Sequence, residues 1–203
     1  NMLEGHQDLI DEVSTGRQSL RDAILPAPGG FSVLLAGSGM VEYSRMTPEI
    51  RDQLHAVIRE VEPMFDHVIL DTGAGISDVV LYTVSLAGEV LVVVTPEPTS
   101  LTDAYATIKV LAAGQGRRQV SLLVNQTRRP GEGRSVRQQL QQVVDRYVNP
   151  GLSSAVRLEL LGEVPADPAV REAVQRRELL FDTMPGVPAS IALASIAGRM
   201  VSA

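Results

Sequence analysis

Residues 66–75 read Asp66-His67-Val68-Ile69-Leu70-Asp71-Thr72-Gly73-Ala74-Gly75. The apolar run ends at an acid, and we predict a buried strand over residues 68–71. Glycines follow, and apolar residues then recur at helical spacing over residues 76–86, which predicts a helix. A carboxylate at the carboxyl end of a buried strand is typical of α/β proteins, which bind ligands at that edge of the sheet. In phosphate-transferring P-loop proteins, such an acid holds Mg²⁺.

The rest of the chain alternates predicted strands and helices around this stretch. Unbroken runs of β-branched and aliphatic residues predict strands over residues 31–36, 90–94, 120–124 and 158–164. Such runs indicate strands that are buried on both faces, as in parallel sheets. We expect helix caps at Thr47, at Thr99 or Ser100, and at Ser135. The pattern predicts one α/β domain over residues 1–203, with a mostly parallel sheet and helices on both faces.

Composition excludes several kinds of functional site. The chain has no cysteine, which excludes disulfides, thiolate metal ligands and cysteine nucleophiles. Its three histidines are scattered, so we do not expect a histidine-built metal site. The net charge of −6 argues against bulk binding to nucleic acid, and we predict no specific nucleic-acid partner.

Lysine usage bears on phosphate binding. Of the 18 basic residues only Lys109 is a lysine, and it lies in a helical pattern with no glycine loop before it. A Walker A loop needs G-x-x-x-x-G-K-[S/T], in which the lysine reaches the β- and γ-phosphates. These 203 residues therefore contain no Walker A motif. A strand–loop–helix–strand unit would supply the phosphate contacts. We expect that this N-terminal unit was removed, was lost in evolution or lies outside the sequence, which leaves the domain incomplete at its N-terminus.

Three segments together resemble the MinD/ParA family of deviant-Walker ATPases. The first is Val68-Ile-Leu-Asp-Thr-Gly-Ala-Gly-Ile76. The second is Pro96-Glu-Pro-Thr-Ser-Leu-Thr-Asp-Ala-Tyr-Ala-Thr-Ile-Lys109, and the third is Leu123-Val-Asn-Gln126. Within the family the sequence is most similar to the bacterial flagellar-number regulators called FlhG or FleN, a likeness that Gly162–Ala173 shares. The resemblance implies a P-loop NTPase-like fold of the SIMIBI/MinD type. It also implies ATP or ADP with Mg²⁺ as ligands, and an ATPase that regulates the number and placement of flagella.

The resemblance assigns roles to Asp71, Thr72 and Gly73. Asp71 is implied as the Walker B-type acid, which binds Mg²⁺ through water, and the two residues after it as part of a loop that senses the γ-phosphate. The order Asp-Thr-Gly-Ala also resembles the active-site turn of aspartic proteases. That fold is nearly all β, whereas the pattern here alternates strands and helices. A third interpretation is that Asp71 caps the turn or helix that follows it.

The resemblance also implies a base-binding region at the ends of two later strands. Asn125 matches the amide that recognises adenine, and Pro165 with Asp167 matches the loop against the base and ribose. Asn125 is equally suited to cap the loop after its strand. Asp167 directly precedes Pro168, an arrangement that also suits a simple helix N-terminus.

Partners and location follow from the same resemblance. It implies a homodimer that binds the flagellar SRP-type GTPase (FlhF), flagellar switch or C-ring proteins, or a FleQ-like flagellar transcription regulator. A cytoplasmic protein is expected, with peripheral association at the inner face of the cell membrane. The apolar pattern over residues 191–201 lacks a basic face, so any membrane-binding segment would lie outside this chain.

Two alternatives to the flagellar ATPase are consistent with the sequence. The chain could be a non-enzymatic partner-binding module derived from a MinD/ParA ATPase, which the lack of a lysine-containing phosphate loop favours. It could also be another positioning or partition ATPase of the MinD type.

Overall fold

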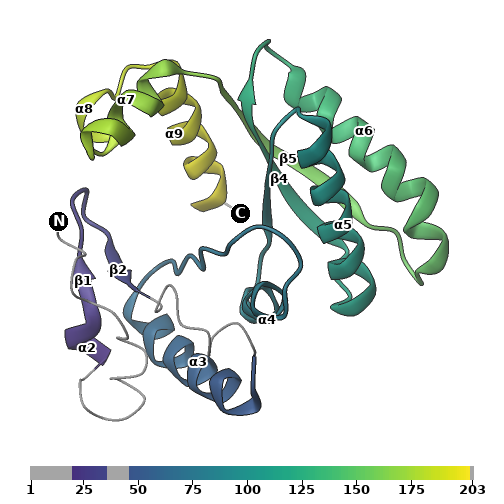
Figure 1. Ribbon diagram of the computed structural model, residues 1–203, viewed down its shortest axis with the longest axis horizontal. Helices are drawn as coiled ribbons and strands as arrows, with labels where there is room; N and C mark the ends of the chain where they lie inside the picture. The colour runs from purple at the N-terminus through teal and green to yellow at the C-terminus, as the bar shows by residue number, and fades with distance from the viewer. Residues whose placement is uncertain (1–19, 36–45, 202–203) are drawn as a thin grey trace. The chain divides into compact units, whose positions relative to one another are not determined.

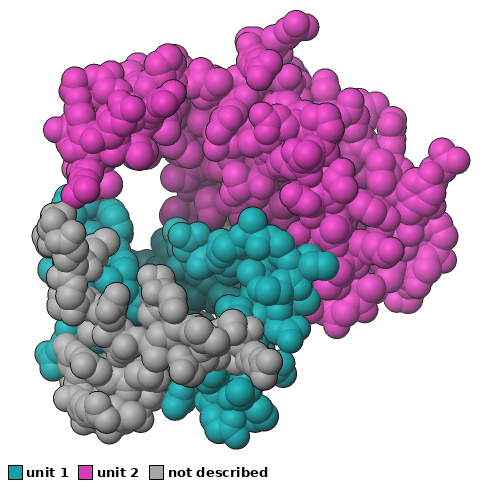
Figure 2. Space-filling model, viewed as in Figure 1, with its two compact units in different colours: residues 1–87 teal, residues 88–203 magenta. Residues whose placement is uncertain are grey.

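A computed structural model of the protein describes residues 20–35 and 46–201. The chain divides into two compact units, residues 1–87 and residues 88–203 (Figure 2). The expectation of a single domain over the whole chain stays a prediction.

The second unit is built on a parallel sheet of three strands in the order β3-β4-β5 (Figure 1). The strands are β3 (Leu91–Val94), β4 (Gln119–Thr127) and β5 (Arg157–Pro165). In the register, Val92 lies opposite Leu122, and Val120 lies opposite Leu158. The three predicted strands in this part of the chain are therefore confirmed, and so is their parallel pairing.

Helices cover both faces of this sheet, as predicted. On one face lie α5 (Pro98–Gly114) and α6 (Glu132–Tyr147). Alternate residues of a strand point to the same face, and the even-numbered residues of β4 enter the main apolar cluster with these helices. That cluster consists of Val94, Ala104, Ile108, Ala112, Val120, Leu122, Val124, Val136, Leu140, Val144, Val148, Val156 and Leu158.

The opposite face is covered by the last helix, α9 (Pro188–Val201) (Figure 1). Leu123 and Val164 of the sheet pack there against Ala189 and Ile196. Before α9 the chain forms η3 (Asn149–Gly151), α7 (Pro168–Arg176) and α8 (Leu180–Thr183).

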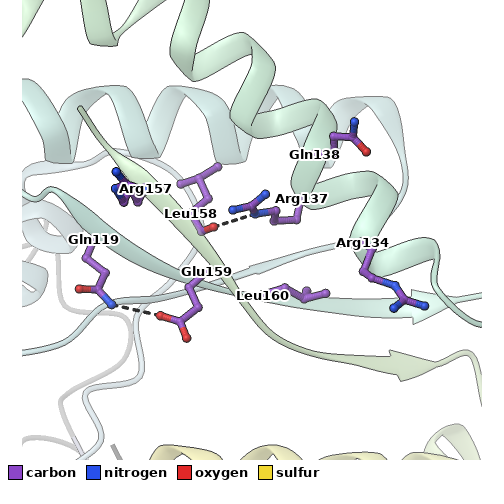
Figure 3. Close-up of a pocket in the computed structure, with 8 residues that line it drawn as sticks. All are labelled: Gln119, Arg134, Arg137, Gln138, Arg157, Leu158, Glu159 and Leu160. Atoms are coloured by element: carbon purple, nitrogen blue, oxygen red, sulfur yellow. Dashed lines mark hydrogen bonds between the residues drawn. The ribbon is translucent and has the colours of Figure 1, made fainter.

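The outer edge of β5 is shielded by two side chains of α6. Gln141 Oε1 accepts from the backbone N–H of Leu158 at 2.8 Å, and its Nε2 donates to the carbonyl of Val156 at 3.0 Å. Arg137 Nε donates to the carbonyl of Leu158 at 2.8 Å (Figure 3). An unpaired strand edge invites association with other chains, and these bonds satisfy part of it.

The first unit contains α2 (Leu20–Ala23), β1 (Ile24–Pro26), β2 (Ser32–Leu34), α3 (Pro48–Val61), η2 (Glu62–Met64) and α4 (Asp78–Leu86). The strands β1 and β2 pair antiparallel, with Leu25 opposite Val33. Leu20, Val57 and Val61 form a small buried cluster beside this hairpin. The predicted strand over residues 31–36 is thus a short hairpin arm, and it does not belong to the parallel sheet.

Thr47 caps α3, as predicted. Its hydroxyl accepts from the N–H of Ile50 at 3.4 Å, and a hydrogen bond from the same side chain holds the pKa of Glu49 below its usual value. Two other cap predictions are wrong. Helix α5 begins at Pro98 after Glu97. The hydroxyl of Ser100, inside its first turn, accepts from the N–H of Thr95, which precedes the helix.

The second wrong cap prediction concerns α6, which begins at Glu132 and not after Ser135. Its N-cap is Gly131, which has a φ of 82°. The extra turn forms because the carboxylate of Glu163, in β5, accepts from free N–H groups at this end of the helix.

The buried strand predicted over residues 68–71 is a further correction. These residues have neither helical nor strand geometry. Val68 is 38% exposed and Ile69 is 81% exposed. A strand needs a neighbour for its backbone groups, and within the described part of the first unit the only paired strands are β1 and β2. The helix predicted after this segment is confirmed as α4, capped by Ser77.

Candidate functional site

The polar residues predicted to bind a base lie at the carboxyl ends of β4 and β5. The register between these strands shifts between Val124 and Thr127, so that Thr127 lies opposite Pro165. Gln126, inside the shift, has a left-handed φ of 59°, which is uncommon for a residue other than glycine. The irregularity lengthens the strand locally, and Asn125 lies at the bulge.

Asn125 is partly exposed, and its amide orientation is fixed by its own backbone. Its Oδ1 accepts from the N–H of Gln126 at 2.9 Å. This leaves the amide nitrogen as a donor with no partner among the described residues. The amide nitrogen is therefore available to donate to a base edge. The bond from the N–H of Gln126 is also the one expected of an asparagine that caps a loop.

Thr127 joins the ends of the two strands. It is only 4% exposed, and its hydroxyl donates to the carbonyl of Val164 at 3.3 Å. Its own carbonyl accepts from the N–H of Ala166 at 2.9 Å. The structure thus brings Asn125 and Pro165 to one edge of the sheet.

Asp167 caps two helices at once. Its Oδ1 accepts from the N–H of Ala169 in the first turn of α7 at 3.0 Å. Its Oδ2 accepts from the N–H of Ala189 in the first turn of α9 at 3.1 Å. The N-cap role that the sequence suggests is confirmed, and the second helix is a finding that the sequence pattern did not indicate. Contact with a base or ribose stays a prediction.

Glu163 is a structural residue of this edge that sequence reasoning missed. Its Oε1 accepts from the N–H of Gly131 at 2.7 Å, and its Oε2 accepts from the N–H of Gly133 at 2.6 Å. A carboxylate is stabilised at a helix N-terminus by the free N–H groups and the helix dipole. The two glycines that flank Glu132 are the only sequence signal for this contact. A side chain does not fit at Gly133, because its Cβ would lie 2.7 Å from Glu163 Oε2.

Thr95 adds a polar atom at the carboxyl end of the neighbouring strand β3. Its hydroxyl oxygen is buried and has no hydrogen-bond partner among the described residues. Buried hydroxyls are normally hydrogen-bonded. This unpaired atom shows that the edge has hydrogen-bonding capacity that the described part of the chain does not use.

The predicted metal residue Asp71 lies in the first unit, with Thr72 and Gly73. Asp71 is exposed and Thr72 is half-buried. The helix after them is capped by Ser77, so Asp71 does not serve as that cap. No cluster of three or more acidic, histidine or cysteine ligands occurs among the described residues. The described residues therefore do not build a complete metal site, and the binding of Mg²⁺ by Asp71 stays a prediction.

A hollow with a volume of about 600 Å³ lies beside α6 (Figure 3). It is lined by Gln119, Arg134, Arg137, Gln138, Arg157, Leu158, Glu159 and Leu160. Gln119 donates to Glu159 there at 3.1 Å, and Arg137 is used to shield β5. Ligands of parallel sheets bind at the carboxyl ends of the strands. This hollow includes the amino ends of β4 and β5, and we do not assign it to the predicted site.

Comparison with known proteins gives the family. No protein-family model matches the chain. The antiactivator FleN of Pseudomonas aeruginosa is 36% identical over 193 residues, which cover 95% of this chain and 67% of FleN. The chain belongs to the FleN family, a branch of the MinD/ParA group. The family resemblance inferred from the sequence is thereby confirmed.

Other comparisons agree with this family. The flagellum site-determining protein YlxH of Helicobacter pylori is 26% identical, with 97% of this chain and 60% of YlxH covered. The septum site-determining protein MinD of Pyrococcus horikoshii, solved with Mg-ADP, superimposes with a TM-score of 0.71. It is 19% identical and the match covers 98% of this chain and 75% of MinD, so it shows the fold alone. The predicted α/β fold class is confirmed.

The structure also bears on the membrane. In the described ranges, no helix has both the length and the apolar character that a membrane span requires.

Proposed function

We propose that this member of the FleN family is a nucleotide-dependent regulator of flagellar number and placement. Mg²⁺ and ATP drive dimerisation, the dimer acts on its flagellar partners, and hydrolysis resets it. The observation that carries the proposal is the pair of Asn125 and Pro165 at one edge of a parallel sheet, in a chain of this family. The free amide donor of Asn125 suits the edge of adenine.

We propose further that the phosphate contacts come from a unit that these 203 residues do not contain. Two features support this. Val93 in β3 is 59% exposed, and β3 pairs only with β4 among the described strands. Val68 and Ile69 have the composition of a strand, are exposed and pair with no strand among the described residues. The complete reading frame tests this proposal, which requires a glycine-rich loop with lysine and fails without one.

Asp71 is proposed to hold Mg²⁺ through water, with Thr72 and Gly73 next to the γ-phosphate. When bound, the ion would neutralise charge on the phosphates. The residues of this chain contribute one exposed carboxylate to that task. Asp167 lies two residues after Pro165 and is the third residue proposed to lie near the nucleotide.

The partner is proposed from the relatives. P. aeruginosa FleN is named an antiactivator, which favours a flagellar transcription regulator of the FleQ type. The SRP-type GTPase FlhF and the C-ring proteins are the other partners proposed. Copurification of each candidate with the dimer, with and without Mg²⁺-ATP, distinguishes among them.

Replacing Asp71 by alanine in the full-length protein is expected to lower Mg²⁺ affinity about 10–100-fold, because a ligand that orients the metal's water is lost. Mg²⁺-ATP-dependent dimerisation should then fail at Mg²⁺ concentrations that support it in the wild type, as measured by light scattering. Asp66→Ala is the matched control, since Asp66 is also exposed. Unchanged ATP turnover in Asp71→Ala would disprove the metal role.

A non-enzymatic partner-binding module is the second candidate. The single lysine of the chain, Lys109 in the middle of α5, favours it. In that case Asp71→Ala would leave partner binding intact, and the wild type would bind its partner equally with and without Mg²⁺-ATP.

A further inference from the structure

Asp167 connects the end of β5 to two helices that are otherwise separate in sequence. Each carboxylate oxygen accepts one backbone N–H, from Ala169 of α7 and from Ala189 of α9, at 3.0 and 3.1 Å. A carboxylate at the N-termini of two helices is favoured by both dipoles. A ribose hydroxyl would have to share oxygens that already bind these two helices.

A continuous series of hydrogen bonds and peptide bonds leads from Asn125 to Asp167. Asn125 Oδ1 accepts from Gln126 N–H, and the next residue, Thr127, accepts from Ala166 N–H through its carbonyl. Ala166 directly precedes Asp167. The loop over residues 165–167 is therefore held by the end of β4 on one side and by α7 and α9 on the other.

The docking of α9 has two further anchors. At its first turn the hydroxyl of Ser190, a fully buried residue, donates to the carbonyl of Met184 at 2.7 Å. Farther along, α9 packs so closely on β5 that a Cβ at Gly162 would overlap the side chain of Ile196. Displacement of α9 would expose Ile196 and its apolar neighbours on the sheet, and this exposure disfavours any opening of α9.

We propose that Asp167 is a positioning residue that links the docking of α9 to the conformation of the base-binding loop. The inference rests on the proposed function, because Pro165 and Asn125 lie at the same edge of the sheet. A base bound at this edge stabilises the loop conformation that Asp167 requires, and the docked state of α9 is favoured with it. Linkage is reciprocal, so displacement of α9 weakens base binding by the same factor.

The test measures amide hydrogen exchange in the full-length protein. Gly162→Ala is used to loosen α9 at Ile196, two turns along the helix from Ala189 and on the same buried face. We expect it to speed exchange in α9 and also, at least about fivefold, at the amides of Ala166 and Ala169. In an Asp167→Ser background, where serine still caps α7, Gly162→Ala should speed exchange in α9 alone.

Two controls make this result decisive. Ser195→Ala changes an exposed residue of α9 and should leave Ala166 and Ala169 unchanged. If Gly162→Ala leaves α9 docked, Ile196→Ala is used instead, because it removes the α9 side chain that packs on β5 at Gly162. Exchange at Ala166 and Ala169 is again the measurement. Faster exchange in α9 with unchanged exchange at Ala166 and Ala169 overturns the link.

Adenosine 5′-monophosphate separates the link from the proposed function. We expect it to slow exchange at Ala189 in the wild type and not in Asp167→Ser. Slowing at Ala166 without slowing at Ala189 overturns the link. No slowing at either amide overturns the base-binding half of the inference, and with it the proposed role of Asn125. In that case the exchange measurements on the variants in the absence of nucleotide still test the link between α9 and the loop.

The same probe distinguishes positioning from direct contact. If Asp167 only positions the loop, Asp167→Ser weakens binding of the ribonucleotide and of its 2′-deoxy analogue by the same factor. If Asp167 contacts the ribose, the variant loses the discrimination between the two, and the positioning role is overturned.

Discussion

Replacing Leu158 by alanine is expected to lower the free energy of unfolding by about 2–5 kcal/mol. Leu158 is 1% exposed, and it lies in the cluster between the sheet and the helices α5 and α6. Its backbone N–H and carbonyl are held by Gln141 and Arg137, so the strand cannot easily move to fill the cavity. Urea unfolding monitored by circular dichroism measures the change.

Val174→Ala is the matched control for this substitution. Val174 is a branched aliphatic residue of α7 in the same unit but is 70% exposed, and its truncation should change the free energy of unfolding by less than about 1 kcal/mol. If Leu158→Ala costs no more than Val174→Ala, the assignment of the core between the sheet, α5 and α6 is incorrect.

Gly133→Ala is the second substitution with a large expected effect. Its Cβ would lie 2.7 Å from Glu163 Oε2 and 3.0 Å from Glu163 Cβ. The carboxylate would be pushed away from the N–H groups of Gly131 and Gly133. Hydrogen bonds to a charged group contribute about 1.5–3 kcal/mol each. We expect a loss of unfolding free energy of about 2–4 kcal/mol, measured by urea denaturation.

Glu163→Ala provides the test of mechanism. It should be destabilising alone, but Gly133→Ala added to it should cost at least about 1 kcal/mol less than in the wild type, because the colliding carboxylate is gone and only the 3.0 Å contact with the Cβ of residue 163 remains. Additive losses in the double variant would show that Gly133 is required for a reason unrelated to Glu163.

The sequence was sufficient for the parallel sheet because its central strand, β4, carries buried apolar residues on both faces. Runs such as Val120–Val124 have only one stable environment, a central strand between layers of helices. The caps at Thr47 and Asp167 were also predictable, since each residue bonds an N–H within three positions of itself. Such local bonds are determined by neighbouring residues in the sequence.

The features that were missed depend on contacts between distant positions. Glu163 binds N–H groups about 30 residues away in sequence, and Asp167 reaches Ala189, 22 residues away. No period or motif indicates such bonds. The strand predicted over residues 68–71 failed for a related reason, because its apolar composition gives it a preference but no pairing partner.

Thermal unfolding of the full-length protein with and without Mg²⁺-ATP tests the central claim most directly, with Asn125→Ala measured beside the wild type. At 100 times Kd, binding stabilises by about 2.7 kcal/mol, which should raise the wild-type Tm by roughly 5–11 °C. Loss of the Asn125 amide removes one hydrogen bond, about 0.5–1.5 kcal/mol, and the rise should be smaller at the same nucleotide concentration. An unchanged wild-type Tm, or an equal rise in Asn125→Ala, would contradict a base-binding site at this edge of the sheet.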